Sequence, residues 1–580
     1  MLSHWHKDFA KAVALSSQRV VISAMERATG LVRGPRVVMQ IRSSVIAVLL
    51  AWAVLGLPAP AWSDASAPAP QSIAALLDGA AADADAASLR SFYAARNDAP
   101  AWTDPARVVA LEAALAGAAD QGLDFTFPKA LAGGSGDGAA RDVALTRLAL
   151  AYATALAKGR VAFDQLEQDW AIPAPSFDAA SGLSAALAHD LAAWFASLPP
   201  QHGDYRRLVA ALAQYRAMAT AGGWAQVPRG EPLKLGMNDE RVRAARKRLE
   251  AEGDLAPLPP SPAPVPAGAP AAASGPIQHV AAISGGAPAP ETVAPPDDAA
   301  AMFDGAMEEA VRRFQRRYGI AVDGAIGPRT LAAMNVPVRA RIEQIELNLE
   351  RWRALPHDLG ASYMMVNVPA EALQIVNDGN LAVTMKVVVG DPDHPTPVVR
   401  TAMVAVQFNP TWTIPASIVT KEIMPKSKRD RSYLLKNDIV FTPGRGWQQL
   451  PGPKNPLGQL KFETPNRFDV YLHDTPSRLA FDRFFRAQSH GCVRLEHASE
   501  LAGFVLRDLG WDEELISKAV AAGGKSRVDL TRPWRVWLLY ATSFVDEDGT
   551  VEFRDDLYGR DGRLKDALGA IRAAERQTGL

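Results

Sequence analysis

The spacing of apolar residues changes near Tyr363 and divides the chain into two kinds of structure. Before this point apolar residues recur every three or four positions, as in Leu145–Leu156, which is typical of one face of a helix. After it they alternate, as in Met364–Val368, which is typical of a strand with one buried face. A chain of 580 residues is also too long for one compact core. We therefore predict a multidomain α+β protein, helical first and mainly β at the end.

A second boundary comes from residues 256–298, which are rich in proline and alanine. Such a segment buries little apolar surface, so we expect an extended loop. It interrupts a small helical unit that begins near Leu233 and resumes at Phe303. These features predict a helical domain over 65–230, an interrupted helical unit over 231–336, and a β domain with a C-terminal extension over 337–580.

The beginning of the chain has the pattern of a targeting segment. Arginines precede the apolar run Val45–Leu57, and small residues follow it. This order is typical of a secretory signal, and the run is shorter than the roughly 20 residues that cross a bilayer comfortably. We predict a targeting segment over 1–64 and export of the protein. Translation from Met39, and retention of the segment as an anchor, both stay open.

Charge and cysteine content narrow the function. The formal net charge of −1 favours neither nucleic acid nor an anionic membrane surface as a partner. Cys492 is the single cysteine, so the chain has no internal disulfide. A lone cysteine is ordinarily a small buried apolar residue, and its neighbours must decide whether it does more.

A stretch before the cysteine carries polar groups in an alternating pattern, and we expect Phe468–His473 to be a strand that ends near Pro476. The residues expected to face the core are Phe468, Val470 and Leu472, and those expected on the opposite face are Asp469, Tyr471 and His473.

The cysteine follows this stretch in the sequence Ser489-His490-Gly491-Cys492. Glycine before the cysteine permits a tight backbone conformation or a close approach of substrate. A thiolate at neutral pH requires a nearby base or positive charge, and His473 and His490 are both candidates. Cysteine activated by an oriented histidine is the general design for thiol acyl transfer.

These residues resemble a known signature. His473 followed by Ser489–Cys492 is similar to the signature of the L,D-transpeptidase catalytic domain, also called the YkuD domain. Three stretches, Asn409–Pro415, Pro451–Gly458 and Val470–Pro476, resemble the large Gram-negative, YcbB-like branch of that family. The general signature usually has asparagine where this chain has Arg494, and we interpret the arginine as a marker of the branch.

Two earlier regions resemble the domains that accompany this branch. Phe303–Leu331, with Leu233–Gly236 as its opening, is similar to a three-helix peptidoglycan-binding domain. Phe92–Trp102 and Gly222–Trp224 are similar to the scaffold domain. The resemblance thus identifies 65–230 as scaffold, 231–336 as peptidoglycan-binding, and 337–580 as catalytic.

The resemblance implies an enzyme that forms 3→3 cross-links between peptidoglycan stem peptides through a cysteine thioester and releases D-Ala. Cys492 would be the nucleophile and His473 the base, with carbapenems as acylating inhibitors. The residues expected to stabilise the oxyanion or to orient the imidazole are Gly491, Cys492, Tyr471 and the backbone carbonyl near Asp474. The residues expected to bind or surround the substrate are His490, Ser489, Arg494 and Trp412.

No cofactor is implied, and no metal, because the histidines and the cysteine are not arranged as a four-ligand set. The implied partners are tetrapeptide stems as donor and acceptor, with no nucleic acid. The implied location is the periplasm, with 1–64 either removed or anchoring the protein to the inner membrane.

Three alternatives stay open from sequence. Water in place of the acceptor amine would give an L,D-carboxypeptidase or hydrolase with the same thioester. The binding-domain resemblance also fits a non-catalytic cell-wall binding protein. A cytosolic redox sensor would require that 1–64 is not a targeting segment.

Overall fold

The computed structural model describes residues 72–78, 84–132, 138–257 and 296–578. These residues lie in one compact unit, Gln71–Leu580. The predicted targeting segment 1–64 and most of the predicted loop 256–298 lie outside the described residues. Within the described ranges, no helix combines the length and apolarity that a membrane crossing requires.

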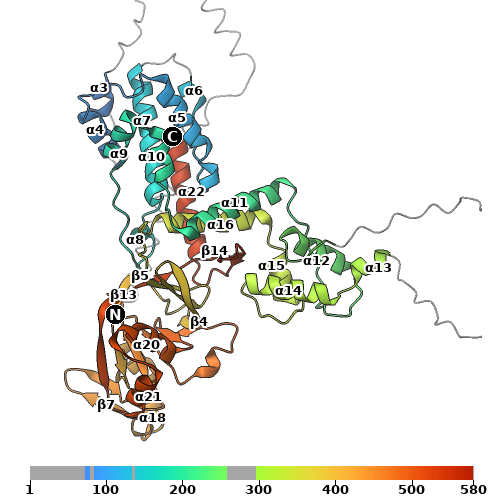
Figure 1. Ribbon diagram of the computed structural model, residues 1–580, viewed down its shortest axis with the longest axis vertical. Coiled ribbons are helices and arrows are strands. Elements are labelled where there is room, and N and C mark those ends of the chain that lie inside the picture. The colour runs from blue at the N-terminus through green and yellow to red at the C-terminus, as the bar shows by residue number, and fades with distance from the viewer. Residues whose placement is uncertain (1–71, 79–83, 133–137, 258–295, 579–580) are drawn as a thin grey trace, which may run out of the picture. The chain divides into compact units, whose positions relative to one another are not determined.

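The first part is helical, as predicted (blue to green in Figure 1). Its helices are α3 Ile73–Asp78, α4 Ala84–Ala94, α5 Pro105–Ala116, η1 Ala119–Gln121, α6 Lys129–Ala132, α7 Gly138–Lys158, α8 Phe163–Leu166, α9 Ala179–Ala188, α10 Leu191–Ser197 and α11 Gly203–Thr220.

Local sequence explains where these helices begin and end. α5, α9 and α10 begin after aspartates (Asp104, Asp178 and Asp190) whose side chains accept hydrogen bonds from first-turn N–H groups. α7 ends where Gly159 takes a left-handed φ of +78°. Buried Asp142 of α7 accepts the Tyr93 hydroxyl at 2.6 Å, which ties α4 to α7.

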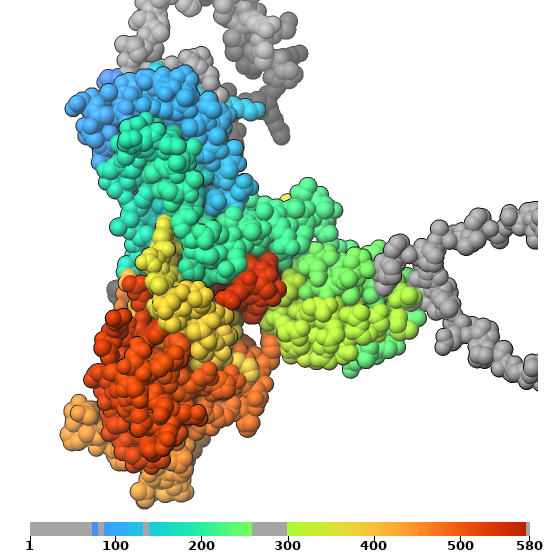
Figure 2. Space-filling model, in the orientation of Figure 1, coloured from blue at the N-terminus to red at the C-terminus, as the bar shows by residue number. Residues whose placement is uncertain are grey.

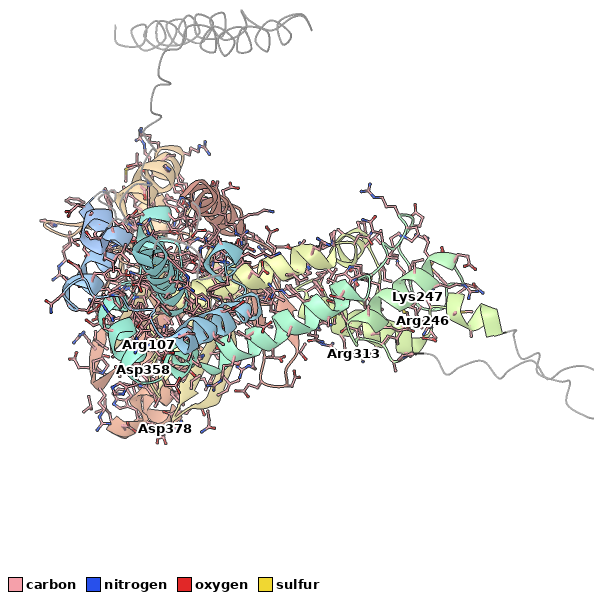
Figure 3. All side chains as sticks on the ribbon, turned by 90° about the horizontal axis from the view of Figure 1, so that it is seen from above. Arg107, Arg246, Lys247, Arg313, Asp358 and Asp378 are labelled. Carbon is pink, nitrogen blue, oxygen red and sulfur yellow. The ribbon has the colours of Figure 1, made fainter. Side chains whose placement is uncertain are left out.

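The second helical unit contains α12 Glu240–Ala251, α13 Pro296–Ala301, α14 Gly305–Arg317 and α15 Pro328–Met334. Arg313 of α14, labelled in Figure 3, donates to the Asp254 carbonyl at 2.7 Å and so fixes the chain after α12. The light-green surface of α14 and α15 borders the green surface of α12 in Figure 2. The helices on either side of the Pro/Ala-rich segment therefore pack together.

Two further helices were not anticipated from sequence: α16 Val338–Arg353 and α22 Arg560–Thr578. α16 packs chiefly against α11. Arg160, which follows α7, forms an ion pair with Glu575 of α22, so the end of the chain returns to the helical part. The predicted domain boundary at 337 stays a prediction.

The last part is built on a 10-stranded sheet. The strands of the whole unit are β1 Trp170–Ala171, β2 Tyr363–Asn367, β3 Ala372–Asn377, β4 Asn380–Gly390, β5 Val398–Phe408, β6 Trp412–Thr413, β7 Ile439–Thr442, β8 Gly446–Gln449, β9 Leu460–Glu463, β10 Leu472–His473, β11 Ala487–Ser489, β12 Val493–Leu495, β13 Ser526–Leu539, β14 Ser543–Val545 and β15 Val551–Phe553.

The main sheet runs in the order β1-β5-β13-β2-β3-β4-β12-β10-β9, and its remaining strand, β11, pairs with β4. Because β9 also pairs with β5, the sheet closes on itself. A hairpin turn at Asp378-Gly379 joins β3 to β4, with φ of +50° and +81°. β13 ends at Leu539, and a separate strand, β14, begins at Ser543.

Two helices follow the cysteine: α20 Ala498–Leu506, extended by η4 Arg507–Leu509 to the left-handed Gly510, and α21 Glu513–Ala521. A short turn, η3 Arg478–Ala480, precedes it.

Between β5 and β9 the chain inserts residues 409–459, which we call the cap. It contains β6–β8, α17 Ala416–Ile418, the π-helical turn η2 Val419–Ile423, α18 Met424–Arg429 and α19 Tyr433–Lys436. Buried isoleucines form its own small core. Asn455 donates to the Pro410 carbonyl at 3.0 Å and accepts from Leu457 N–H, so this asparagine ties together the two ends of the cap.

Candidate active site

Strand register brings three titratable side chains together. His473 of β10 pairs with Lys461 of β9 on one side and with Arg494 of β12 on the other. Residues directly opposite one another in neighbouring strands share a face of the sheet. The adjacent set, Phe462, Leu472 and Val493, is fully buried in the core. The sheet therefore places one imidazole between two cations.

The imidazole of His473 has a defined tautomer. Its Nδ1 lies 2.5 Å from the backbone oxygen of Asp474. A carbonyl can only accept, so Nδ1 carries the proton and Nε2 keeps a lone pair. Burial, then the charge of Arg494, lower the pKa of His473 from 6.5 to about 3, so the ring is neutral at neutral pH. This places the Asp474 carbonyl in the orienting position that was predicted.

The Asp474 side chain fixes the turn that presents this carbonyl. One carboxylate oxygen accepts the Gln459 N–H at 2.8 Å, and the other pairs with Arg478. Gly458 lies against the carboxylate: a Cβ at that position would be 2.3 Å from Asp474 Oδ2. Gly458 also has a left-handed φ of +60°.

The predicted strand over Phe468–His473 is wrong for most of its length, since only Leu472–His473 is a strand. The Asn466 side chain accepts the Phe468 N–H at 3.0 Å and donates to the Val470 carbonyl. Asp469 takes a left-handed φ of +52°. These local hydrogen bonds take the place of the interstrand hydrogen bonds that a strand would make. Tyr471 and His473 still share a face, with ring centroids 5.7 Å apart.

The turn Ser489–Cys492 is held by backbone bonds. The Ser489 hydroxyl donates to the Cys492 carbonyl at 2.6 Å and accepts the Gly491 N–H at 3.1 Å. Gly491 has a φ of +101°, which side-chain-bearing residues rarely adopt. Its carbonyl accepts the Thr396 hydroxyl at 2.8 Å. The cysteine thus sits on a turn fixed from both sides.

Two sequence predictions change here. The Gly491 N–H is engaged by Ser489, so its predicted role as an oxyanion donor is not supported. Ser489 is 2% exposed, and its hydroxyl makes hydrogen bonds within the turn, so its predicted contact with substrate is not supported either. Among the described residues the Cys492 N–H donates no hydrogen bond. It is therefore the backbone N–H of this turn that is left to donate to an oxyanion.

The thiol of Cys492 is half-buried beside Tyr471. Burial raises the pKa of Cys492, while a hydrogen bond from the Tyr471 backbone and the charges of Lys461 and Arg494 lower it. The sulfur lies 4.0 Å from the Asp469 carbonyl oxygen. Within the described residues it makes no hydrogen bond to His473; such contacts are often loose before substrate binds.

Tyr471 connects the other groups of the site. Burial, then the Cys492 thiol, raise the pKa of Tyr471, and Trp412 lowers it through a hydrogen bond. The phenol therefore stays protonated and can donate. Trp412 of β6 is contributed by the cap, so the predicted wall residue does lie at the site.

His490 and Arg494 occupy different surroundings. His490 Nε2 lies 3.3 Å from Glu422 of the cap, and its ring is 4.5 Å from that of His394. Arg494 has no carboxylate partner in the described part of the chain, and burial lowers its pKa. His490 therefore contacts the cap, and Arg494 carries a charge with no carboxylate partner among the described residues.

Sequence reasoning missed Lys461. Its ammonium lies 3.8 Å from the centroid of the Tyr471 ring, a cation–π contact. Burial lowers the pKa of Lys461, and Glu463 and Cys492 oppose that change. The lysine is ordinary in sequence, and only the pairing of β9 with β10 reveals it.

Replacing Gly458 tests the turn that orients His473. In Gly458→Ala the new methyl group would displace the Asp474 carboxylate, and with it the carbonyl that holds Nδ1. A misplacement of about 1 Å costs on the order of 10²-fold in rate, so we expect such a loss of Cys492 acylation. Acyl-enzyme formation is followed by intact-mass spectrometry.

The matched control is Gly510→Ala, because Gly510 has a similar φ of +76° but open space around it. Both variants should lose about 1–3 kcal/mol of stability from backbone strain. Only Gly458→Ala should also lose acylation of Cys492. Equal acylation in the two variants would contradict this account of the turn.

Comparison with family models places these features in known domains. Residues 361–529 match the "L,D-transpeptidase catalytic domain" (YkuD). Residues 87–212 match the "Scaffold domain", and residues 293–334 match the "Putative peptidoglycan binding domain". The catalytic match contains every residue of the candidate site described above.

Similar proteins agree with the models. A curated protein of Haemophilus influenzae, "Putative L,D-transpeptidase", is 29% identical over 241 residues, 38% of this chain and 49% of that protein. The match spans about half the length of that relative.

Solved structures were also found. An L,D-transpeptidase from Mycobacterium smegmatis is 14% identical, with 31% of this chain and 58% of that chain covered and a TM-score of 0.18. An L,D-transpeptidase from Xylanimonas cellulosilytica is 16% identical, with 54% and 99% covered and a TM-score of 0.18. Three stretches of the chain are thus similar, in succession, to a scaffold domain, a peptidoglycan-binding domain and the YkuD catalytic domain of L,D-transpeptidases.

Proposed function

We propose that this protein is a cysteine L,D-transpeptidase that forms 3→3 cross-links between peptidoglycan stem peptides and releases D-Ala. The observation that carries the proposal is the neutral imidazole of His473, oriented through Nδ1 by the Asp474 carbonyl, on the sheet next to the turn that presents Cys492. This is the arrangement that thiol acyl transfer requires.

The first half-reaction acylates the cysteine. Cys492 Sγ attacks the carbonyl carbon between the L-centre of diaminopimelate and the terminal D-Ala of a tetrapeptide stem. His473 Nε2 takes the thiol proton and transfers it to the departing D-Ala amine. The Cys492 N–H and the Tyr471 hydroxyl stabilise the oxyanion of the tetrahedral intermediate.

The second half-reaction transfers the acyl group. The side-chain amine of a second stem attacks the thioester carbonyl, and His473 takes its proton and returns it to the Cys492 sulfur as the bond to sulfur breaks. Arg494, which has no carboxylate partner in the described residues, pairs with a substrate carboxylate. Trp412 and His490 line the substrate's path beneath the cap.

The proposal also covers the location of the protein and its partners. The substrate lies outside the cytoplasm, so the enzyme works in the periplasm. The helical unit over 231–336 holds the enzyme to the cell wall. Anchoring to the inner membrane would depend on residues 1–64, which lie outside the described residues.

Product analysis tests the proposal. Protein lacking residues 1–64 is incubated with a disaccharide tetrapeptide, and the products are separated and identified by mass. We expect free D-Ala and a 3→3 cross-linked dimer. Shortened tripeptide without any dimer would move the assignment to the L,D-carboxypeptidase. Neither product, in folded protein that still binds sacculi, would favour the non-catalytic binding protein.

A further inference from the structure

Lys461 faces the reacting groups from β9 and has no part in the mechanism above. Its neighbour across the ladder is His473, and its ammonium lies 3.8 Å from the centre of the Tyr471 ring. Tyr471 in turn contacts the Cys492 thiol. Lys461 is therefore one side chain away from the nucleophile.

The charge of this lysine is not neutralised by a close partner. Within the described residues its ammonium forms no ion pair within 4.0 Å, and Glu463, on its own strand, pairs with Arg527 instead. A half-buried lysine without a salt bridge is costly, because burial disfavours the charged form. Negative charge that appears nearby during a reaction would offset that cost.

We propose that Lys461 positions Tyr471 and supplies the positive charge that stabilises the thiolate of Cys492. The cation–π contact holds the Tyr471 ring beside the sulfur, and the ammonium favours the negative charge left on Sγ when His473 takes the thiol proton. This role of Lys461 rests on the proposed acyl transfer, which is the reaction that the thiolate would serve. The effect of Lys461 on the thiol is nevertheless measurable without substrate.

Other groups near the site also change the stability of the Cys492 thiolate, and their effects add to or oppose that of Lys461. Arg494 on β12 and the hydrogen bonds from Tyr471 also favour the thiolate. Asp469 acts on Lys461, where its carboxylate favours the charged ammonium. Lys525 and Glu463 act on Lys461 itself, in opposite directions. Because Arg494 remains when Lys461 is removed, the loss should be partial rather than complete.

The test is the pH dependence of Cys492 alkylation by iodoacetamide. The thiolate sulfur forms a bond to the CH₂ carbon, iodide leaves, and the thiol proton goes to the buffer, so the rate follows the thiolate fraction. Cys492 is the single cysteine of the chain, and each adduct therefore reports on one site.

Lys461→Met keeps the side-chain length and removes the charge. A nearby positive charge lowers a thiol pKa, so its loss should raise the apparent pKa of alkylation by about one unit. At pH values below the pKa the alkylation rate should fall roughly tenfold. Lys461→Arg, which keeps the charge, should recover most of the wild-type profile.

Lys386→Met is the matched control. Lys386 lies on β4 of the same sheet and pairs with Glu496 at 3.2 Å, away from the thiol. Its alkylation profile should equal that of wild type. Circular dichroism establishes that each variant is folded, and Lys461→Gln replaces Lys461→Met if the latter does not fold.

A wild-type alkylation profile in folded Lys461→Met or Lys461→Gln would overturn the proposal. So would a Lys461→Arg profile shifted as far as that of Lys461→Met, because charge would then not be the cause. Failure of the proposed function has a different signature: a shifted thiol profile together with no acyl transfer in wild type would reject the transpeptidase and leave the role of Lys461 standing.

Discussion

Cys492→Ala is expected to abolish both acyl-enzyme formation and cross-linking while leaving the fold intact. Cys492 is the sole cysteine and makes no hydrogen bond that holds the turn, which depends on Ser489 and Thr396 instead. Removal of the nucleophile from a catalytic triad lowers kcat by on the order of 10⁶-fold. Intact-mass spectrometry after incubation with a disaccharide tetrapeptide should therefore find a thioester adduct on wild type alone.

A conservative replacement separates the thiol's chemistry from its shape. Cys492→Ser keeps the size of the side chain, but a hydroxyl is a far weaker nucleophile than a thiol whose proton the imidazole can remove. We expect no adduct with the tetrapeptide or with a carbapenem, and thermal unfolding close to that of wild type. An adduct on Cys492→Ala of the same mass as on wild type would place the nucleophile elsewhere and reject the assignment.

The sequence suggests the proposed chemistry because the residues that would carry it are close to one another in the chain. Cys492 and His490–Gly491 are contiguous, and His473 lies a short distance upstream, so one motif carries both the nucleophile and the base. The orienting carbonyl of Asp474 follows His473 directly in the chain. His473 and the Asp474 carbonyl are adjacent in the chain, whereas His473 and the turn of Cys492 are brought together by the pairing of β10 with β12.

What the sequence missed depends on pairing between distant segments. Lys461 reaches the site because β9 lies beside β10, and nothing near Lys461 in the chain signals that neighbour. The buried position of Ser489 likewise follows from the turn around Gly491. Register in a sheet is a tertiary property, so these roles appear only once the strands are placed.

Two errors of secondary structure have physical causes in particular polar side chains. Alternation over Phe468–His473 suggested a strand, but the Asn466 side chain takes the backbone bonds that a ladder would use. Helix α16 was overlooked because it buries polar side chains, such as Asn348 and Arg353, among its apolar ones, which weakens the helical pattern. Buried polar residues are satisfied by partners far away in sequence, and sequence alone does not name those partners.

His473→Gln is expected to lower the rate of acyl transfer by about 10²–10⁴-fold, because it removes the general base while keeping a side chain that can bond to the Asp474 carbonyl. The wild-type enzyme should show no loss of this base between pH 7 and pH 5. Burial and the charge of Arg494 hold the His473 pKa near 3, so the imidazole stays neutral across that range. A fall in kcat/KM centred near pH 6.5 would contradict the buried, neutral base.

The same lowering of the His473 pKa also makes the stability of the folded protein depend on pH. The unfolded chain binds a proton at this histidine below about pH 6.5, whereas the folded chain does so only near pH 3. The unfolded state therefore holds more protons between these values, and the folded state loses stability as the pH falls through that window. In His473→Gln this contribution is absent, so its Tm should decline less steeply between pH 6.5 and pH 4 than that of wild type. His497→Gln, at an exposed histidine, should decline as wild type does. Parallel Tm profiles for wild type and His473→Gln would mean that His473 is accessible to protons in the folded enzyme, and the base would then have to work from a pKa nearer its ordinary value.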